Sequence, residues 1–142
     1  MPSNINEMQD AVIQKFSLLN DWFEIYEYLI QMGKKFEAVD QDILNDDYLI
    51  SGCQSKVWLK ADIKNKKIHY SAYSDSLIVK GMISLLLTAI NDKNPQDIVN
   101  ADLYFIEKIG LKSNLSPSRA NGLFSIINSM KLYAEEAMKN SK

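Results

Sequence analysis

The chain has 142 residues, of which 46% are hydrophobic and 24% are charged, and its formal net charge is −2. This composition is typical of one globular domain spanning residues 1–142, and it argues against a disordered or fibrous chain. The near balance of charges argues against a dedicated nucleic-acid-binding protein, which is usually strongly basic.

The counts of cysteine and histidine exclude several kinds of site. Cys53 is the only cysteine and His69 the only histidine. An internal disulfide is therefore impossible, as is a zinc site or iron–sulfur cluster held by cysteines of this chain alone. The N-terminus carries no basic and apolar leader, and no uncharged stretch approaches the ~20 residues of a membrane span. We therefore expect a cytoplasmic protein with no membrane partner.

The first fifty residues predict two helices and a loop. Apolar residues at helical spacing predict a helix near residues 5–19. Asp21 and Glu24 form a capping-box pattern at the start of a second helix, and Gly33 is expected to end it. The following loop extends to residue 50, and its last three residues are expected to add a short strand.

An alternating pattern then predicts a β-hairpin. Apolar and polar residues alternate over residues 56–73, around a turn at Asn65 and Lys66. His69 is expected to be a solvated strand residue, and Trp58 is interpreted either as covered by helices or as an anchor for a partner. The hairpin lysines favour either a soluble edge that resists pairing or attraction to an acidic partner. They are Lys56, Lys60, Lys64, Lys66 and Lys67.

The second half of the chain predicts further helices. Cap patterns occur at Ser74-Asp75, Asn94-Pro95 and Ser116-Pro117. The helices expected after them end near residues 90, 101 and 138, and another over residues 103–109 is expected to stop at Gly110. Asp75 is interpreted as an N-cap rather than a catalytic acid. The order of helices, strands and helices predicts an α+β fold, with a small antiparallel sheet packed against helices on one face.

Cys53 is the residue best suited to carry chemistry. It precedes the first long strand, and its neighbours Gly52, Gln54 and Ser55 offer backbone freedom and polar groups that could hydrogen-bond a sulfur anion. The alternative is a buried cysteine that acts as a small apolar residue. Arg119 is the only arginine and lies where a cation opposes the helix dipole. It is interpreted either as organising the Cys53 loop or as forming a structural salt bridge.

Four segments together resemble the SufE family of sulfur acceptors. The segment 51–58, SGCQSKVW, resembles the family's cysteine signature, and the segments 74–81, 94–99 and 115–123 resemble its later blocks in the same order. Many members carry a histidine where this chain has Asn114. The resemblance implies a SufE/IscU-like fold, with the reactive cysteine on a loop and its sulfur resting in an apolar pocket.

The resemblance also implies a function. In such proteins the cysteine that matches Cys53 takes persulfide sulfur from a cysteine desulfurase similar to SufS or CsdA. It stimulates that enzyme and passes the sulfur to an iron–sulfur scaffold similar to SufBCD. Pyridoxal phosphate would belong to the desulfurase, so no cofactor is expected in this chain, which would be a transfer partner rather than a stand-alone enzyme.

Two alternatives are carried alongside this function. One is an adaptor that activates the desulfurase without carrying sulfur, and the other is a thiol enzyme such as a peroxidase. The second requires an activated thiol, and the sequence offers neither a visible base nor a resolving cysteine. The oligomeric state, including a weak homodimer, is left open.

Overall fold

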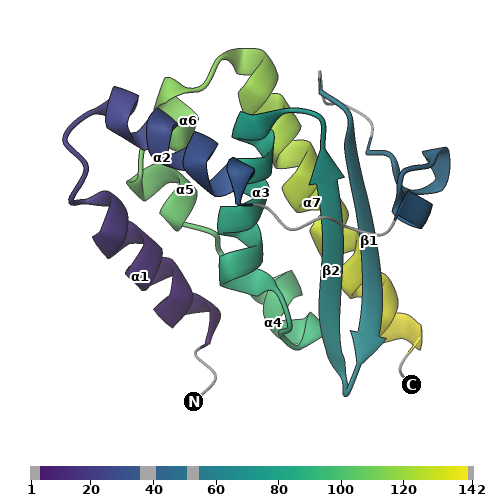
Figure 1. Cartoon of the computed structure of the whole chain (residues 1–142). Coiled ribbons are helices and arrows are strands. Elements are labelled where there is room, and N and C mark those ends of the chain that lie inside the picture. The colour runs from purple at the N-terminus through teal and green to yellow at the C-terminus, as the bar shows by residue number, and fades with distance from the viewer. Residues whose placement is uncertain (1–3, 36–40, 51–54, 141–142) are drawn as a thin grey trace.

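The computed structural model describes residues 4–35, 41–50 and 55–140, and it confirms the predicted α+β fold. Helix α3 lies in the middle, with α1 and α2 on one side and the hairpin on the other (Figure 1). The N-terminal elements are α1 (Ile5–Phe16), α2 (Trp22–Lys34) and the 3-10 turns η1 (Gln41–Ile43) and η2 (Asp46–Tyr48). The strands β1 (Val57–Lys64) and β2 (Lys67–Ser74) follow. The remaining helices are α3 (Leu77–Ile90), α4 (Pro95–Asn100), α5 (Phe105–Lys108), α6 (Leu111–Asn114) and α7 (Pro117–Asn140).

Three of the predicted helix starts are confirmed by their hydrogen bonds. The Asp21 carboxylate accepts from the Glu24 N–H at 3.0 Å at the start of α2. Asn94 caps α4 ahead of Pro95, and the Ser116 hydroxyl accepts from the Arg119 N–H at 3.3 Å in the first turn of α7. Each cap satisfies an N–H group that has no partner within the helix.

The predicted cap of α3 is wrong by one or two residues. Ser76 is the N-cap, and its hydroxyl accepts from the Val79 N–H at 3.4 Å. Ser74 instead accepts from the N–H of Ser76, at 3.2 Å. Asp75 is not a cap, because its carboxylate accepts the N–H of Lys56 at 3.1 Å, just before β1.

The predicted hairpin and its turn are confirmed. β1 and β2 pair antiparallel from Val57 opposite Ser74 to Lys64 opposite Lys67. Asn65 and Lys66 between them have φ values of 53° and 64°, which indicates a type I′ turn. A lysine in this left-handed region is strained by roughly 1–2 kcal/mol relative to the glycine usually found there.

The predicted third strand is wrong as a strand. Within the described residues the pairing amounts to a single bridge between Leu49 and Trp58, supported by a hydrogen bond from the Ile50 N–H to the Val57 carbonyl at 2.8 Å. The 3-10 turn η2 ends at Tyr48 and bends the preceding residues away, so the pairing does not extend.

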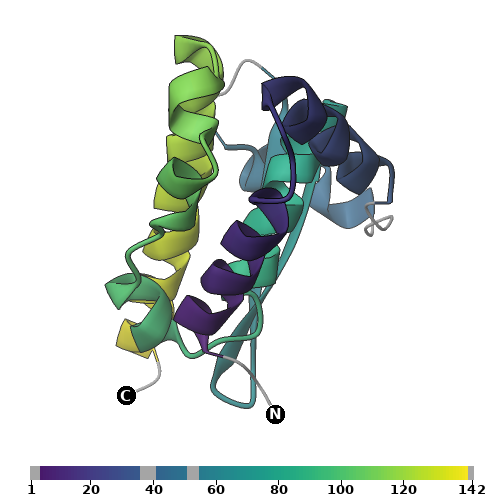
Figure 2. The same cartoon turned by 90° about the vertical axis from the view of Figure 1, so that its left-hand side faces the viewer.

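One face of the hairpin packs against α3 and α7, as the alternation predicts. Leu59, Ile68 and Tyr70 on this face are at most 1% exposed. The Tyr70 hydroxyl donates to the Met130 carbonyl of α7 at 2.6 Å, and burial raises the pKa of this phenol, so it remains a donor at neutral pH. In Figure 2 the long helix α7 and the helices α1–α3 form two groups, and the hairpin lies behind α1–α3.

A three-residue turn after α3 covers the outer edge of β2. The Ile68 N–H donates to the Lys93 carbonyl at 2.9 Å, and the Asp92 N–H donates to the Ile68 carbonyl at 2.8 Å. The Asn91 side chain accepts from the Tyr70 N–H at 2.7 Å. These bonds give three outward backbone groups of β2, the N–H and C=O of Ile68 and the N–H of Tyr70, partners within the same molecule.

Two glycines bring the backbones of α2 and α3 into direct contact. A Cβ at Gly33 would overlap the carbonyl oxygen of Leu77, and a Cβ at Gly81 would overlap the carbonyl oxygen of Leu29. Gly33 was expected to end α2, but the helix continues to Lys34. Its absent side chain instead allows the close crossing, a role that depends on a residue in another helix.

Gly81→Ala is expected to destabilise the protein. The added methyl group meets backbone rather than a movable side chain, so we expect the free energy of unfolding to fall by about 3 kcal/mol in urea denaturation. Ser84→Ala, almost one turn further along α3, adds no Cβ and is expected to change it by less than about 0.5 kcal/mol. Equal urea midpoints for Gly81→Ala and the wild type would contradict this account of the crossing.

Candidate functional site

The predicted sulfur-bearing loop is only partly covered by the structure. Gly52, Cys53 and Gln54 lie outside the described residues. Ile50 on one side of the loop and Ser55 on the other are described, as is Arg119. The candidate site is therefore built from the residues that flank the loop.

A small cavity lies where the start of β1 meets α3 and α7. Its volume is about 60 Å³, several times the ~10–15 Å³ of accessible volume that one water needs. Five apolar side chains line it, from Val57, Val79, Met82, Leu123 and Ile126, and its polar lining includes Ser55, Ser118 and Arg119. The cavity brings together Ser55 and Arg119, two predicted site residues that are 64 positions apart in the sequence.

Backbone hydrogen bonds hold both flanks of the loop at the start of β1. On the entry side the Ile50 N–H donates to the Val57 carbonyl at 2.8 Å. On the exit side Lys56 and Asp75 exchange two bonds: the Lys56 N–H donates to the Asp75 carboxylate at 3.1 Å, and the Asp75 N–H donates to the Lys56 carbonyl at 3.3 Å. Sequence reasoning assigned Asp75 to a helix cap and missed this role.

Arg119 lies in the first turn of α7 and is exposed. In the described part of the chain its guanidinium takes part in no ion pair, so the interpretation as a structural salt bridge finds no support there. A guanidinium keeps its charge at any physiological pH and can donate several hydrogen bonds. At the edge of a cavity that five apolar side chains line, it is placed to attract an anion.

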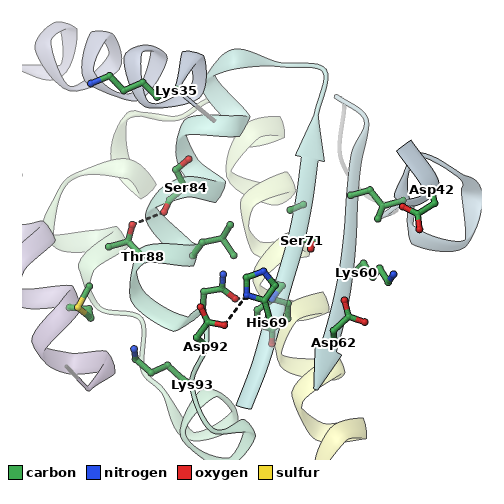
Figure 3. A pocket seen from close by; sticks show the side chains of 16 residues that line it. Lys35, Asp42, Lys60, Asp62, His69, Ser71, Ser84, Thr88, Asp92 and Lys93 are labelled. Atoms are coloured by element: carbon green, nitrogen blue, oxygen red, sulfur yellow. Dashed lines mark hydrogen bonds and ion pairs between the residues drawn. The ribbon is translucent and has the colours of Figure 1, made fainter. Parts of the chain in front are cut away.

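A larger groove lies on the other face of the hairpin (Figure 3). Its volume is about 840 Å³, and residues from the hairpin, α3 and the turn after α3 contribute to its lining. His69 and Asp92 form an ion pair in it, with 2.8 Å between the His69 Nδ1 and a carboxylate oxygen, and both side chains are largely exposed, at 45% and 63%. An exposed pair of this kind adds little stability. The prediction that His69 is a solvated strand residue agrees with this exposure.

The groove lacks the geometry of a catalytic triad or a metal site. A triad needs a hydroxyl or thiol bonded to the histidine, but within the described residues the hydrogen bonds of His69 lead to Asp92 alone. Thr88 in the groove donates its hydroxyl to the Ser84 carbonyl instead. No group of three or more His, Cys, Asp or Glu side chains suited to a metal ion occurs among the residues that the structure describes.

Trp58 lies between the two roles predicted for it. Its side chain is half-buried and its ring lies 6.2 Å from that of Tyr73, at a tilt of 37°. The Lys80 ammonium stands 4.4 Å from the centre of the Tyr73 ring, within the range of a cation–π contact. The ring is therefore neither fully buried nor fully free as a partner anchor.

Comparisons with known proteins agree on one family. The model of the SufE family, described as the Fe-S metabolism associated domain, matches residues 10–134. An uncharacterised SufE-like protein of Synechocystis is 35% identical over 123 residues, which cover 87% of this chain and 77% of that protein. Another from Rhizobium meliloti is 33% identical over 131 residues, which cover 89% of this chain and 94% of that protein.

A solved structure supports the fold. The solution structure of a hypothetical protein from Thermus thermophilus superposes with a TM-score of 0.76, and the match covers 93% of this chain and 96% of that one. Its sequence identity of 16% bears on the fold alone. Among the described residues, no helix has both the length and the hydropathy needed to cross a bilayer.

Asp75→Ala is expected to loosen the exit of the loop. The substitution removes the acceptor of the Lys56 N–H, and we expect a loss of about 1 kcal/mol in urea denaturation together with faster hydrogen exchange at the Lys56 amide. Asp75→Asn keeps an acceptor oxygen and should retain most of the protection, and Glu135→Ala serves as a control on α7. Unchanged exchange at Lys56 in Asp75→Ala would show that the carboxylate does not hold the strand.

Proposed function

Since the chain belongs to the SufE family, and with it to Fe-S metabolism, we propose that it is a cytoplasmic sulfur carrier that works through Cys53. The donor is the persulfide of a pyridoxal-phosphate-dependent cysteine desulfurase, which the carrier also stimulates. The recipient is an iron–sulfur assembly scaffold. In this proposal pyridoxal phosphate stays with the desulfurase, and the carrier itself needs no cofactor.

The proposed transfer balances without an external oxidant or reductant. The Cys53 thiolate attacks the outer sulfur of the enzyme's cysteine persulfide, and a new S–S bond forms as the old one breaks. The desulfurase cysteine leaves as a thiolate, and Cys53 becomes the persulfide. An unassisted thiol with a pKa near ~8.5 is mostly protonated at neutral pH, so a partner group or a nearby cation must favour the thiolate.

The cavity beside Ser55 is the observation that carries the proposal. Cys53 and Ser55 are two positions apart in the sequence. Because consecutive Cα atoms are about 3.8 Å apart, the Cα atoms of these two residues lie no more than about 7.6 Å apart. Five apolar side chains line the cavity together with Ser55, Ser118 and Arg119, and the cavity has room for a two-sulfur group. Such a pocket supports a carrier, because a persulfide held away from solvent meets fewer oxidants and stray thiols.

Arg119 and Ser55 are proposed to support the sulfur anion. Both line the cavity, Arg119 as a permanent cation and Ser55 as a hydroxyl donor. An opposite charge nearby favours the ionised form of a thiol and so lowers its pKa. Gly52 and Gln54, next to Cys53 in the sequence, are proposed to shape the loop and to add hydrogen bonds.

Cys53→Ser is expected to abolish sulfur uptake. After incubation of the wild type with a cysteine desulfurase and L-cysteine, intact mass spectrometry should show a gain of one sulfur atom that a reductant removes. The serine variant should show no gain and should no longer stimulate the desulfurase, while it still binds that enzyme. Full stimulation by Cys53→Ser would instead identify an adaptor that carries no sulfur.

Val79→Phe is expected to expose the thiol. The larger side chain fills the cavity, so the Cys53 thiol should alkylate with iodoacetamide several-fold faster than in the wild type. The wild-type thiol itself should react more slowly than glutathione at the same pH. Val99→Phe makes the same change on α4, away from the cavity, and should leave the rate unchanged. A wild-type rate equal to that of glutathione would refute the shielding role.

A further inference from the structure

The hairpin is a basic element in an acidic protein. β1 and β2, with the turn between them, carry four lysines and one aspartate, whereas the whole chain has a formal net charge of −2. Three of the lysines, Lys64, Lys66 and Lys67, lie at the turn and are exposed. In Figure 2 this turn extends past the ends of the neighbouring helices. The positive charge is therefore concentrated on a projecting part of the molecule.

The positive charge at the turn is not compensated within the described residues. Lys64 and Lys67 lie directly opposite each other across the strands, an arrangement in which like charges repel. The bridge to Ile68 brings Lys93 to the same end of the hairpin. None of these lysines takes part in an ion pair in the described part of the chain. An anionic partner at the turn would relieve this repulsion.

The edge of β1 next to these lysines has free backbone groups. Alternate residues of β1 point their N–H and C=O groups away from β2, and the bond from Ile50 to the Val57 carbonyl identifies these as the odd-numbered ones. The Tyr133 hydroxyl of α7 donates to the next outward carbonyl, that of Leu59, at 3.1 Å. The following outward groups, on Ala61 and Ile63, have no hydrogen-bond partner among the described residues.

The side chains beside this edge suit an added strand. Ile63 is 52% exposed, and its side chain lies on the face of β1 opposite that of Lys60 and Lys64, so the two faces of the edge are apolar and basic. An extended segment that pairs with an edge gains main-chain hydrogen bonds, and its alternate side chains determine specificity. Glutamate or aspartate side chains would meet the lysines, and a β-branched residue would cover Ile63.

We propose that the β1 edge at Ala61 and Ile63, together with the lysines of the turn, binds an acidic, extended segment of a partner protein as an added strand. The unpaired backbone groups favour a protein over a nucleic acid, since neither duplex nor single-stranded nucleic acid pairs with a strand edge. The negative net charge of the rest of the chain disfavours a polyanion that would cover a wider surface.

This edge is distinct from the proposed sulfur-transfer site. Val57 lines the cavity, and Ala61 and Ile63 lie four and six residues further along β1, about 13 and 20 Å away at 3.3 Å per residue. A partner strand at the turn would therefore leave the cavity accessible to a second protein.

The binding test is a titration of the isotope-labelled full-length protein with a short capped peptide of alternating glutamate and valine. We expect the amide signals of Ala61 and Ile63 to shift and their hydrogen exchange to slow. A lysine–valine peptide should not bind. In the double variant Lys64→Glu/Lys67→Glu the affinity should fall at least about tenfold. The matched double variant Lys108→Glu/Lys112→Glu reverses two exposed lysines on α5 and α6 and should bind as the wild type does.

Ala61→Pro tests the backbone contribution. The Ala61 N–H points outward, so proline removes that donor without breaking the ladder with β2. The variant should lose peptide binding while Ala61→Ser retains it, and the lysine variants decide the matter if Ala61→Pro fails to fold. The proposal is overturned if the glutamate–valine peptide does not bind at millimolar concentration or shifts other amides instead. It is equally overturned if Lys64→Glu/Lys67→Glu binds normally, or if a single-stranded oligonucleotide or an anionic vesicle binds the turn as tightly as the peptide.

Discussion

The close crossing of α2 and α3 is the contact on which the rest of the structure depends. Because Gly33 and Gly81 carry no side chains, the two helix backbones touch, and α3 is held at a fixed height and angle against the N-terminal helices. Val79 and Met82, which follow within two turns of the start of α3, thereby stand in the cavity wall. The hairpin packs on the opposite side of α3, so the start of β1 takes its position from the same contact.

Most features that depend on neighbours in the sequence could be predicted, apart from the cap of α3, whereas features that depend on distant residues could not. The caps at Asp21 and Asn94 and the turn at Asn65 are local arrangements, and each was identified correctly. Gly33 and Asp75 were misread, because their partners, Leu77 and Lys56, lie 44 and 19 positions away in the sequence. A sequence pattern can predict such a role only when the distant residue that makes the contact is already known.

The candidate site likewise combines features that the sequence predicts with features that it does not. The sequence motif around Cys53 predicts where the proposed sulfur chemistry would take place, and Ser55 and Arg119 both line one cavity beside that loop. The cavity itself has no signal in the sequence, because its apolar walls come from three separate elements, in which the same residues read as ordinary core. The hairpin links this site to the lysine-rich turn, so one rigid element presents different chemistry at its two ends.

The turn that follows α3 limits where further strands can be added to the hairpin. Asn91, Asp92 and Lys93 occupy the outer edge of β2 at Ile68 and Tyr70, so near the hairpin turn a strand can be added only along β1. Fibrils form when each molecule has two open strand edges, so that it pairs with one molecule at each edge. At this end of the hairpin such growth stops after one added strand, which favours a finite complex over a self-propagating filament.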